Sequence, residues 1–214
     1  MSTTVFGHSV NGRISSSEQL REVAKMPSRY VDSKVIDHID LLAERFIAAS
    51  PLAILGTRRR DGGVDQTPRG DPPGFVKVLD PKTLALPDRP GNHRMDAIEN
   101  MLHDTAVGLI FMIPGHGDTI RVSGQGAVVQ DDDLADLLAV NGRPAGLITL
   151  IRVERVLCHC PKAFIRSRAW KPDEWPDTSD VPSLAEMMKA HGKMSDTISE
   201  LEEVIHRSNT ERLY

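Results

Sequence analysis

Arg69 is the first residue whose surroundings suggest chemistry. It lies in TPRGDPPGF, with Pro68 before it and Gly70 after it, just ahead of a sharp bend and near the end of a predicted strand. These two neighbours restrict the directions in which the guanidinium can project. An arginine suits a terminal phosphate because its planar fork can bind two oxygens at once. The alternative is an exposed arginine in an ordinary turn.

Arg94 is the second candidate. It follows the Pro/Gly turn in LPDRPGNHRMDAIENMLHD, where the sequence predicts a helix from about 93 to 103 with Asn92 as its N-cap. A helix N-terminus has unpaired N–H groups and a partial positive charge, so a cation there is unfavourable unless an anion joins it. Arg94 is therefore either a phosphate ligand or a surface charge paired with Asp88 or Asp96.

Two further stretches carry arginines at element ends. Arg121 lies in the predicted strand TIRVSGQG, where Gly124 and Gly126 remove side chains from one face and permit close approach of a flat ligand or another backbone. The stretch AFIRSRAW has two arginines two residues apart, which share one face if the chain is extended, and Trp170 follows them. Each pattern is weak alone, and together they predict basic positions around one sheet.

Composition excludes several classes of function. The 214 residues are 40% apolar and 26% charged with a net charge of −4, so no global basic field attracts nucleic acid or anionic membranes. The aromatic fraction of 4% is too low for a base-stacking platform. No secretory signal, membrane-spanning stretch, nucleophile motif or metal-ligand motif is recognisable, so we expect a cytoplasmic protein without a metal site. Cys158 and Cys160, one residue apart, are expected to be reduced and partly buried, although a redox or metal role stays open.

The elements that position these residues are mainly strands. Two helices are predicted first, one near SSSEQLREVAKM with Ser16 and Gln19 at capping-box spacing, and one over 31–50 with a continuous apolar stripe. Short apolar segments linked by Gly, Pro and Asp turns follow, which predicts an antiparallel barrel or sandwich with helices at its ends. The predicted strands lie within PLAILGTRR, VDQTPRG, FVKVLD, TLALP, AVGLIFMI, TIRVSGQGAVVQ and LITLIRVERVLCHC. The chain becomes helical again from Ser183.

The order of these motifs resembles the pyridoxamine 5'-phosphate oxidase-like family of FMN-binding split barrels, over about residues 46–175. The resemblance implies a mainly β fold with flanking helices, namely a six-stranded antiparallel split β-barrel that forms a homodimer with FMN at the subunit interface. The phosphate would be bound by Arg69 and Arg94, with main-chain groups along the flavin edge and a C-terminal segment, from the same or the partner subunit, reaching the site. The implied cofactor-binding residues are Thr67, Arg69, Leu86, Pro87, Asp88, Asn92, His93, Arg94, Arg121, Ser167, Arg168 and Trp170.

The resemblance also implies a function. We expect an FMN-binding oxidoreductase acting on an unknown small molecule, in which the cofactor carries the redox chemistry. Non-catalytic flavin storage or sensing is the alternative, and haem binding or dependence on a deazaflavin is less favoured. The basic, leucine-containing motif of the oxidase itself is replaced here by TPRGDPPG, and its C-terminal Arg-Leu signature is not recognisable, so the chain is expected to be a divergent member. No catalytic base is assigned, and His93 is expected to be structural. The expected domains are a helical extension (1–45), the split barrel (46–175) and a second helical extension (176–214).

Overall fold

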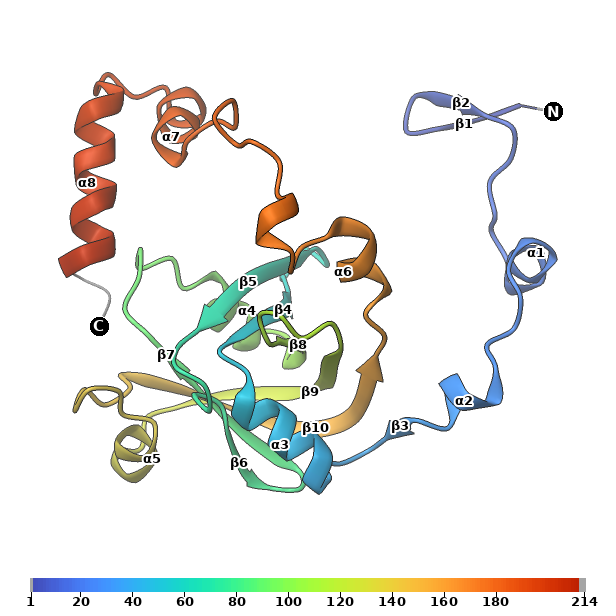
Figure 1. The fold of residues 1–214 in the computed structure, drawn as a ribbon, viewed down its shortest axis with the longest axis horizontal. Helices are drawn as coiled ribbons and strands as arrows, with labels where there is room; N and C mark the ends of the chain where they lie inside the picture. Colours follow the sequence, from blue (N-terminus) through green and yellow to red (C-terminus); the bar gives the residue numbers. More distant parts are fainter. Residues whose placement is uncertain (1, 212–214) are drawn as a thin grey trace. The chain divides into compact units, whose positions relative to one another are not determined.

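The computed structural model describes residues 2–211, and the chain divides into two compact units, Met1–Val35 and Ile36–Tyr214 (Figure 1). The first unit has an antiparallel hairpin of β1 (Thr3–Val5) and β2 (His8–Val10), followed by α1 (Ser17–Val23) and α2 (Arg29–Asp32). Helices alone were predicted for this extension, and the hairpin was missed. Its turn has positive φ at Phe6 as well as Gly7, and the Phe is not a typical turn residue.

The predicted cap of α1 is present in a modified form. The Ser16 side chain accepts a hydrogen bond from the main-chain N–H of Gln19 at 3.3 Å, as the spacing predicts. The Gln19 side chain reaches back to the main-chain N–H of Ser15 at 2.9 Å, one residue before the N-cap. The two contacts therefore satisfy one N–H on each side of the helix start.

The second unit contains the main sheet, which has eight strands among the described residues. Seven of them follow the order β5-β4-β8-β9-β10-β7-β6, with antiparallel neighbours throughout, and the short β3 (Val35–Ile36) lies off this path. The other strands are β4 (Leu52–Arg58), β5 (Val64–Gly70), β6 (Lys77–Asp80), β7 (Thr83–Asp88), β8 (Ala106–Met112), β9 (Thr119–Val129) and β10 (Leu147–His159).

The mainly β fold with flanking helices is confirmed, although the sheet has eight strands rather than six. Strands β4 to β10 coincide with the segments that alternation and turn residues predicted. Along β9 the residues from Ile120 to Gly126 are buried and exposed in turn, which is the period-2 pattern of a sheet with one face on a core. The core of this unit includes Leu55, Leu84, Phe111 and Ile151, each at most 1% exposed.

The predicted helix over 31–50 is wrong in its first half. From residue 33 onward only Leu41–Ala49 forms a helix there, α3, because Asp40 is an N-cap whose carboxylate accepts a hydrogen bond from the Ala43 N–H at 2.8 Å. Ile39 is buried before the helix begins, while Leu42, expected on the apolar face, is 68% exposed. The apolar spacing that suggested one long helix combines residues of a strand, a loop and a short helix.

Five further α-helices of this unit are α4 (Asp96–Met101), α5 (Asp132–Leu137), α6 (Lys162–Ser167), α7 (Leu184–Gly192) and α8 (Ile198–Glu211), and a 3-10 turn η1 covers Pro172–Glu174. Helix α4 packs on β4, β5 and β9, whereas α7 and α8 pack on each other (Figure 1). The stretch 163–170 is helix and turn, so the condition under which its two arginines would share one face, an extended chain, is not met. No helix within residues 2–211 combines the length and apolar character needed to cross a membrane.

Candidate functional site

A cavity of about 640 Å³ opens between the end of β5 and the segment that joins β7 to α4. We call it the large pocket. It brings together seven of the residues predicted from the sequence: Thr67, Arg69, Pro87, Asp88, Asn92, His93 and Arg94. Its remaining lining is Pro68, Gly70, Phe75, Arg89, Pro90, Gly91, Met95, Pro144, Gly146 and Leu147. Apolar walls with a few polar groups at one end are typical of a small-molecule pocket, and the volume is in the usual range.

Arg69 is the most enclosed predicted cation of this pocket, with its side chain 19% exposed. Its guanidinium donates to the Thr67 hydroxyl at 2.7 Å and to the Pro68 carbonyl at 3.0 Å, and lies 3.5 Å from the Asp88 carboxylate. Burial lowers the pKa of Arg69, and the nearby carboxylate opposes this shift. Burial likewise raises the pKa of Asp88, against the effect of the arginine. The two charges of this pair therefore compensate each other only in part, because the distance between the guanidinium and the carboxylate is too long for a good hydrogen bond.

Arg94 lies before α4 and not inside its first turn, which corrects the predicted helix start. The helix begins at Asp96 with Met95 at the N-cap position, and His93 has a positive φ of 59° that no helix continues. The Asn92 side chain accepts a hydrogen bond from the Arg94 N–H at 3.0 Å, so it stabilises the turn that leads into the helix.

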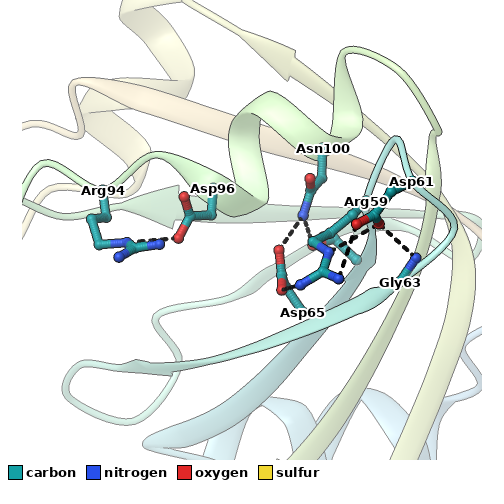
Figure 2. A network of polar contacts seen from close by, with 8 residues as sticks. Arg59, Asp61, Gly63, Asp65, Arg94, Asp96 and Asn100 are labelled. Atoms are coloured by element: carbon teal, nitrogen blue, oxygen red, sulfur yellow. Dashed lines mark hydrogen bonds and ion pairs between the residues drawn. The ribbon is translucent and has the colours of Figure 1, made fainter. Parts of the chain in front are cut away.

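The Arg94 side chain is 74% exposed and forms an ion pair with Asp96, with Nε 2.9 Å from the carboxylate (Figure 2). This pair raises the pKa of Arg94. Asp96 is one of the two carboxylates that the sequence suggested as a partner for a surface Arg94. Because an exposed pair of this kind is weak, it leaves Arg94 available to a stronger anion.

A second cavity of about 230 Å³ adjoins the large pocket and shares four residues with it: Thr67, Arg69, Asn92 and Arg94. We call it the small pocket. Its other lining residues are Asp65, Gln66, Asp96 and Ala97. It therefore presents two arginines, a hydroxyl and two amides, which are donors that suit a phosphate, together with two carboxylates that oppose an anion.

A polar network fixes one wall of the small pocket. The buried Asn100 amide of α4 donates to the Asp65 carboxylate at 2.9 Å and to the Thr57 hydroxyl at 3.1 Å (Figure 2). Arg59 lies 3.5 Å from the same carboxylate and is hydrogen bonded to Asp61. Asp65 thus has two partners besides the pocket, the Asn100 amide and Arg59, and α4 is tied to β4 and β5 at the pocket.

Arg89 lines the large pocket and is hydrogen bonded to Asp71, and neither residue was predicted from the sequence. Arg89 Nε donates to the Asp71 carboxylate at 2.6 Å, and Nη2 donates to the Leu138 carbonyl at 2.6 Å. Their side chains are 14% and 1% exposed, so the pair is buried in the wall of the pocket. Each residue lies next to a proline in a turn, and nothing in the local pattern indicates that the two turns meet.

Five predicted residues lie outside the large pocket. The Leu86 side chain is buried in the core at 1% exposure, which leaves only its main chain for a ligand. Arg121 projects from the exposed face of β9, beside Ile110 of β8 in the pairing register. Ser167 ends α6, and Arg168 and Trp170 line a third cavity on another part of the unit.

Gly124 explains the glycine spacing near Arg121. A Cβ at this position would lie 1.9 Å from the Arg152 carbonyl oxygen, where the pairing of β9 with β10 shifts register. Of the two explanations left open by the sequence, close approach of another backbone is the one observed at Gly124.

The two cysteines are free and exposed, so the expected partial burial is wrong. Cys158 lies at the end of β10, where it is paired with Ile120 of β9, and Cys160 lies just beyond the strand. In the part of the chain that the structure describes, no group of three or more His, Cys, Asp or Glu side chains is arranged to hold a metal ion.

The donors and walls together define the ligand that the two pockets can accept. Arg69, Arg94, Thr67 and Asn92 suit a phosphate, while the prolines, Phe75 and Leu147 of the large pocket suit an apolar ring system next to it. A phosphorylated molecule with a flat ring matches this arrangement of groups.

Comparison with known proteins agrees with this chemistry. The family model described as pyridoxamine 5'-phosphate oxidase matches residues 40–160, more than half of the chain. The matched range includes β4 to β9, all of β10 and both pockets. Curated proteins gave no match.

Several solved structures are similar to this chain. HupZ from Group A Streptococcus is 16% identical, with a TM-score of 0.44, and the match covers 55% of this chain and 91% of that chain. A protein related to general stress protein 26 from Clostridium acetobutylicum is 12% identical, with a TM-score of 0.44 and coverages of 56% and 87%. An FMN-binding protein from Syntrophomonas wolfei is 13% identical, with a TM-score of 0.42 and coverages of 53% and 80%. With TM-scores this low, the assignment rests on the family model.

Proposed function

Because the chain belongs to the pyridoxamine 5'-phosphate oxidase family, we propose that it binds FMN in the large and small pockets and uses it to oxidise or reduce a small molecule. The observation that carries the proposal is Arg69, an enclosed guanidinium held by Thr67 at the junction of the two pockets. Burying a cation whose neighbouring carboxylate compensates its charge only in part destabilises the folded protein, unless a bound anion also compensates the charge.

In this proposal the small pocket holds the phosphate. Arg69 offers a planar pair of donors from β5, and Arg94 offers a second guanidinium from the other side, with Thr67 and Asn92 beside them. To reach a phosphate, Arg94 exchanges its exposed contact with Asp96 for the ligand. Pro87 and Asp88 of the large pocket would lie along the flavin ring, and the other prolines of the lining would offer it apolar surface.

A bound flavin supplies hydride transfer, which needs no protein nucleophile. The residues of this chain bind and orient it. Burial raises the pKa of Asp88, so this carboxyl of the large pocket holds a proton more readily than an exposed carboxyl does, while His93 keeps its structural role in the turn before α4.

The wider organisation expected from the sequence belongs to the same proposal. It comprises a homodimer with flavin at the subunit interface, a cytoplasmic location and a barrel domain over 46–175 between two extensions. Free, exposed Cys158 and Cys160 suit a reducing compartment.

Flavin titration tests the proposal. FMN and riboflavin differ only in the phosphate, and binding of each is measured by quenching of flavin fluorescence. We expect wild type to prefer FMN, and Arg69→Ala to lose about 1.5–3 kcal/mol of FMN binding, the usual contribution of a hydrogen bond to a charged group. Riboflavin binding should change little. Arg152→Ala, an exposed arginine of β10, is the matched control.

Two results would overturn the proposal: equal affinity of wild type for FMN and riboflavin, or unchanged FMN affinity in the Arg69→Ala, Arg94→Ala double variant. Turnover is tested separately. Bleaching of bound flavin by NADH or NADPH, followed by recovery with an electron acceptor, supports an enzyme, whereas tight FMN that no nicotinamide reduces supports a storage or sensing protein.

A further inference from the structure

Residues 2–34 form secondary structure without a core of their own, and we call them the N-terminal arm. The arm contains the β1–β2 hairpin and the helices α1 and α2, and no residue within it is buried. Its large apolar side chains are 41% to 97% exposed, namely those of Phe6, Ile14, Leu20, Val23, Met26, Tyr30 and Val31. So many exposed apolar groups on one short segment indicate a surface that a partner covers.

The elements of the arm are too small to be stable alone. An isolated two-stranded hairpin is marginal in water, and so is a helix shorter than about 12–15 residues. Each strand of the arm has three residues, α1 has seven and α2 has four. The Ser16 cap satisfies a main-chain N–H at the start of α1, but it buries no apolar surface. The arm therefore needs contacts from outside its own residues.

Phe6 occupies the hairpin turn in a conformation that suits other residues. Its φ is 49° and its side chain is 97% exposed. A bulky side chain with positive φ is strained, and Gly or Asn is usual at such turn positions. Strain of this kind is retained where the position of one side chain is used. An exposed aromatic ring on a turn is suited to be an anchor that enters the surface of a partner.

Arg29 and Tyr30 form a second group of this type. The Arg29 guanidinium lies over the Tyr30 ring, 4.9 Å from its centroid, and donates a hydrogen bond to the Tyr30 hydroxyl at 3.0 Å. The contact holds both side chains in one arrangement, although Tyr30 is 71% exposed. Tyrosine and arginine are enriched among the residues that dominate protein interfaces. Because the pair is ordered in advance, it loses less side-chain entropy on docking.

Charge indicates which surface the arm fits. The arm has five basic and three acidic residues, a net charge of +2, whereas the rest of the chain has 21 basic and 27 acidic residues, a net charge of −6. The rest of the chain also exposes apolar side chains beside carboxylates. Leu102, 72% exposed, follows the acidic helix α4, and Leu137, 52% exposed, ends the acidic helix α5. Basic and apolar groups of the arm thus complement acidic and apolar groups of the remainder.

From these features we infer that the N-terminal arm docks on the acidic surface of a second copy of this chain, with Phe6 and the Arg29–Tyr30 pair as anchors. Within one chain the apolar side chains of the arm stay exposed, which favours a second copy over the chain itself. In a two-fold dimer each copy gives one arm and receives one, so the exchange is closed. The inference goes beyond the proposed function, because the arm shares no residue with the large or the small pocket.

Photo-crosslinking tests which chain receives the arm. Val23, which is 74% exposed, is replaced by p-benzoylphenylalanine, and this protein is co-expressed with a tagged full-length copy that lacks the photoreactive group. We expect irradiation to join the two chains, and mass spectrometry to place the crosslink within residues 36–211 of the tagged copy. The same replacement in a Phe6→Asn, Tyr30→Ser background should give several-fold less of the joined product, because both anchors are lost.

Limited digestion with trypsin measures how much of the arm is undocked, because cleavage after Lys25 tracks the population of the free arm. Phe6→Asn, Tyr30→Ser should raise the cleavage rate at least about tenfold, whereas the matched Phe6→Tyr, Tyr30→Phe variant, which keeps both rings, should change it little. Asparagine tolerates the positive φ at position 6, so the hairpin turn is retained. Arg21→Glu should raise the rate about threefold and Glu22→Gln should not raise it, since only the first change repels an acidic acceptor.

Three outcomes would overturn the inference. One is a crosslink confined to the chain that carries the photoreactive group. Another is the absence of any joined product, including the case in which the arm binds anionic phosphatidylglycerol vesicles instead. The third is an unchanged rate of cleavage after Lys25 in the Phe6→Asn, Tyr30→Ser variant. Failure of FMN to bind would contradict the proposed function and leave the crosslink intact, whereas a dimer whose arm is free would contradict the inference and leave the proposed function intact.

Discussion

Replacing Asp71 by Asn is expected to destabilise the protein strongly, because it breaks the buried ion pair in the wall of the large pocket. The Asp71 side chain is 1% exposed and accepts a hydrogen bond from Arg89 Nε at 2.6 Å. Arg89 also holds the Leu138 carbonyl at the end of α5. One guanidinium thus joins the turn after β5, the segment after β7 and the C-terminus of α5.

The magnitude follows from burial. An isosteric amide keeps the shape but removes the charge that compensates a guanidinium only 14% exposed. Breaking one side of a buried pair costs about 3–5 kcal/mol, because the remaining charge is left uncompensated. We therefore expect Asp71→Asn to lower the free energy of unfolding by about 3–5 kcal/mol, a large part of the stability of an ordinary domain.

Urea denaturation measures this free energy, followed by far-UV circular dichroism. Asp118→Asn is the matched control, since its carboxylate is 55% exposed and lies 3.8 Å from a histidine, and it should change stability by about 0.5 kcal/mol or less. The double variant Asp71→Leu, Arg89→Met should recover part of the loss, because it removes both charges together but also removes the hydrogen bond to the Leu138 carbonyl. A loss below about 1 kcal/mol for Asp71→Asn would refute the reasoning.

Three further perturbations test the pockets and the sheet. The Asp96→Asn variant should bind FMN about twofold to fivefold more tightly, because its arginine partner is freed from the ion pair, and its affinity for riboflavin should not change. Glu99→Gln, in the same helix turn, should change neither affinity. Fluorescence titration measures both affinities in each variant. Because burial raises the pKa of Asp88, the folded state holds this proton more tightly than the unfolded state, so the contribution of Asp88 to stability falls as pH rises from about 4 through the raised pKa. The difference in unfolding free energy between wild type and Asp88→Asn should decline over that range, and a constant difference would contradict the assignment. Gly124→Ala should lower the free energy of unfolding by at least about 2 kcal/mol, because the new Cβ would lie 1.9 Å from a main-chain carbonyl of β10. A Cβ at position 108 would meet no atom within 4 Å, so Gly108→Ala should cause no comparable loss of stability, and thermal melts compare the two variants.

The local pattern predicted strands better than helices in this chain. Strands β4 to β10 are bounded by turns that contain Gly, Pro and Asp. Apolar and polar residues alternate along a strand with a period of two, so a few residues are enough to recognise the pattern. The helix over 31–50 was overextended because residues of three different elements happened to have helical spacing. In the same way Arg94 was placed inside α4, although Asn92 and His93 form a separate turn before it.

The candidate site was predictable only in part. Arg69 and Arg94 were found because proline, glycine and a helix start constrain them locally, and the family pattern joined them. Arg89 and Asp71 were missed because their pairing depends on two turns that meet in space, 18 residues apart in the chain. Ser167, Arg168 and Trp170 were assigned to the same site, from this or the partner subunit, and within one chain Arg168 and Trp170 line another cavity.

Residue types, local spacing and motif order were therefore enough to predict the strand segments, the fold family and the two arginines proposed to bind phosphate. They were not enough to predict which side chains share a cavity, which ion pairs are buried and which rings stack. These properties depend on sheet register and on the meeting of distant turns, such as Asp71 with Arg89 and Gly117 with Pro161. The local spacing of apolar and polar residues does not reveal these properties, because they are fixed by contacts between residues that are far apart in the chain.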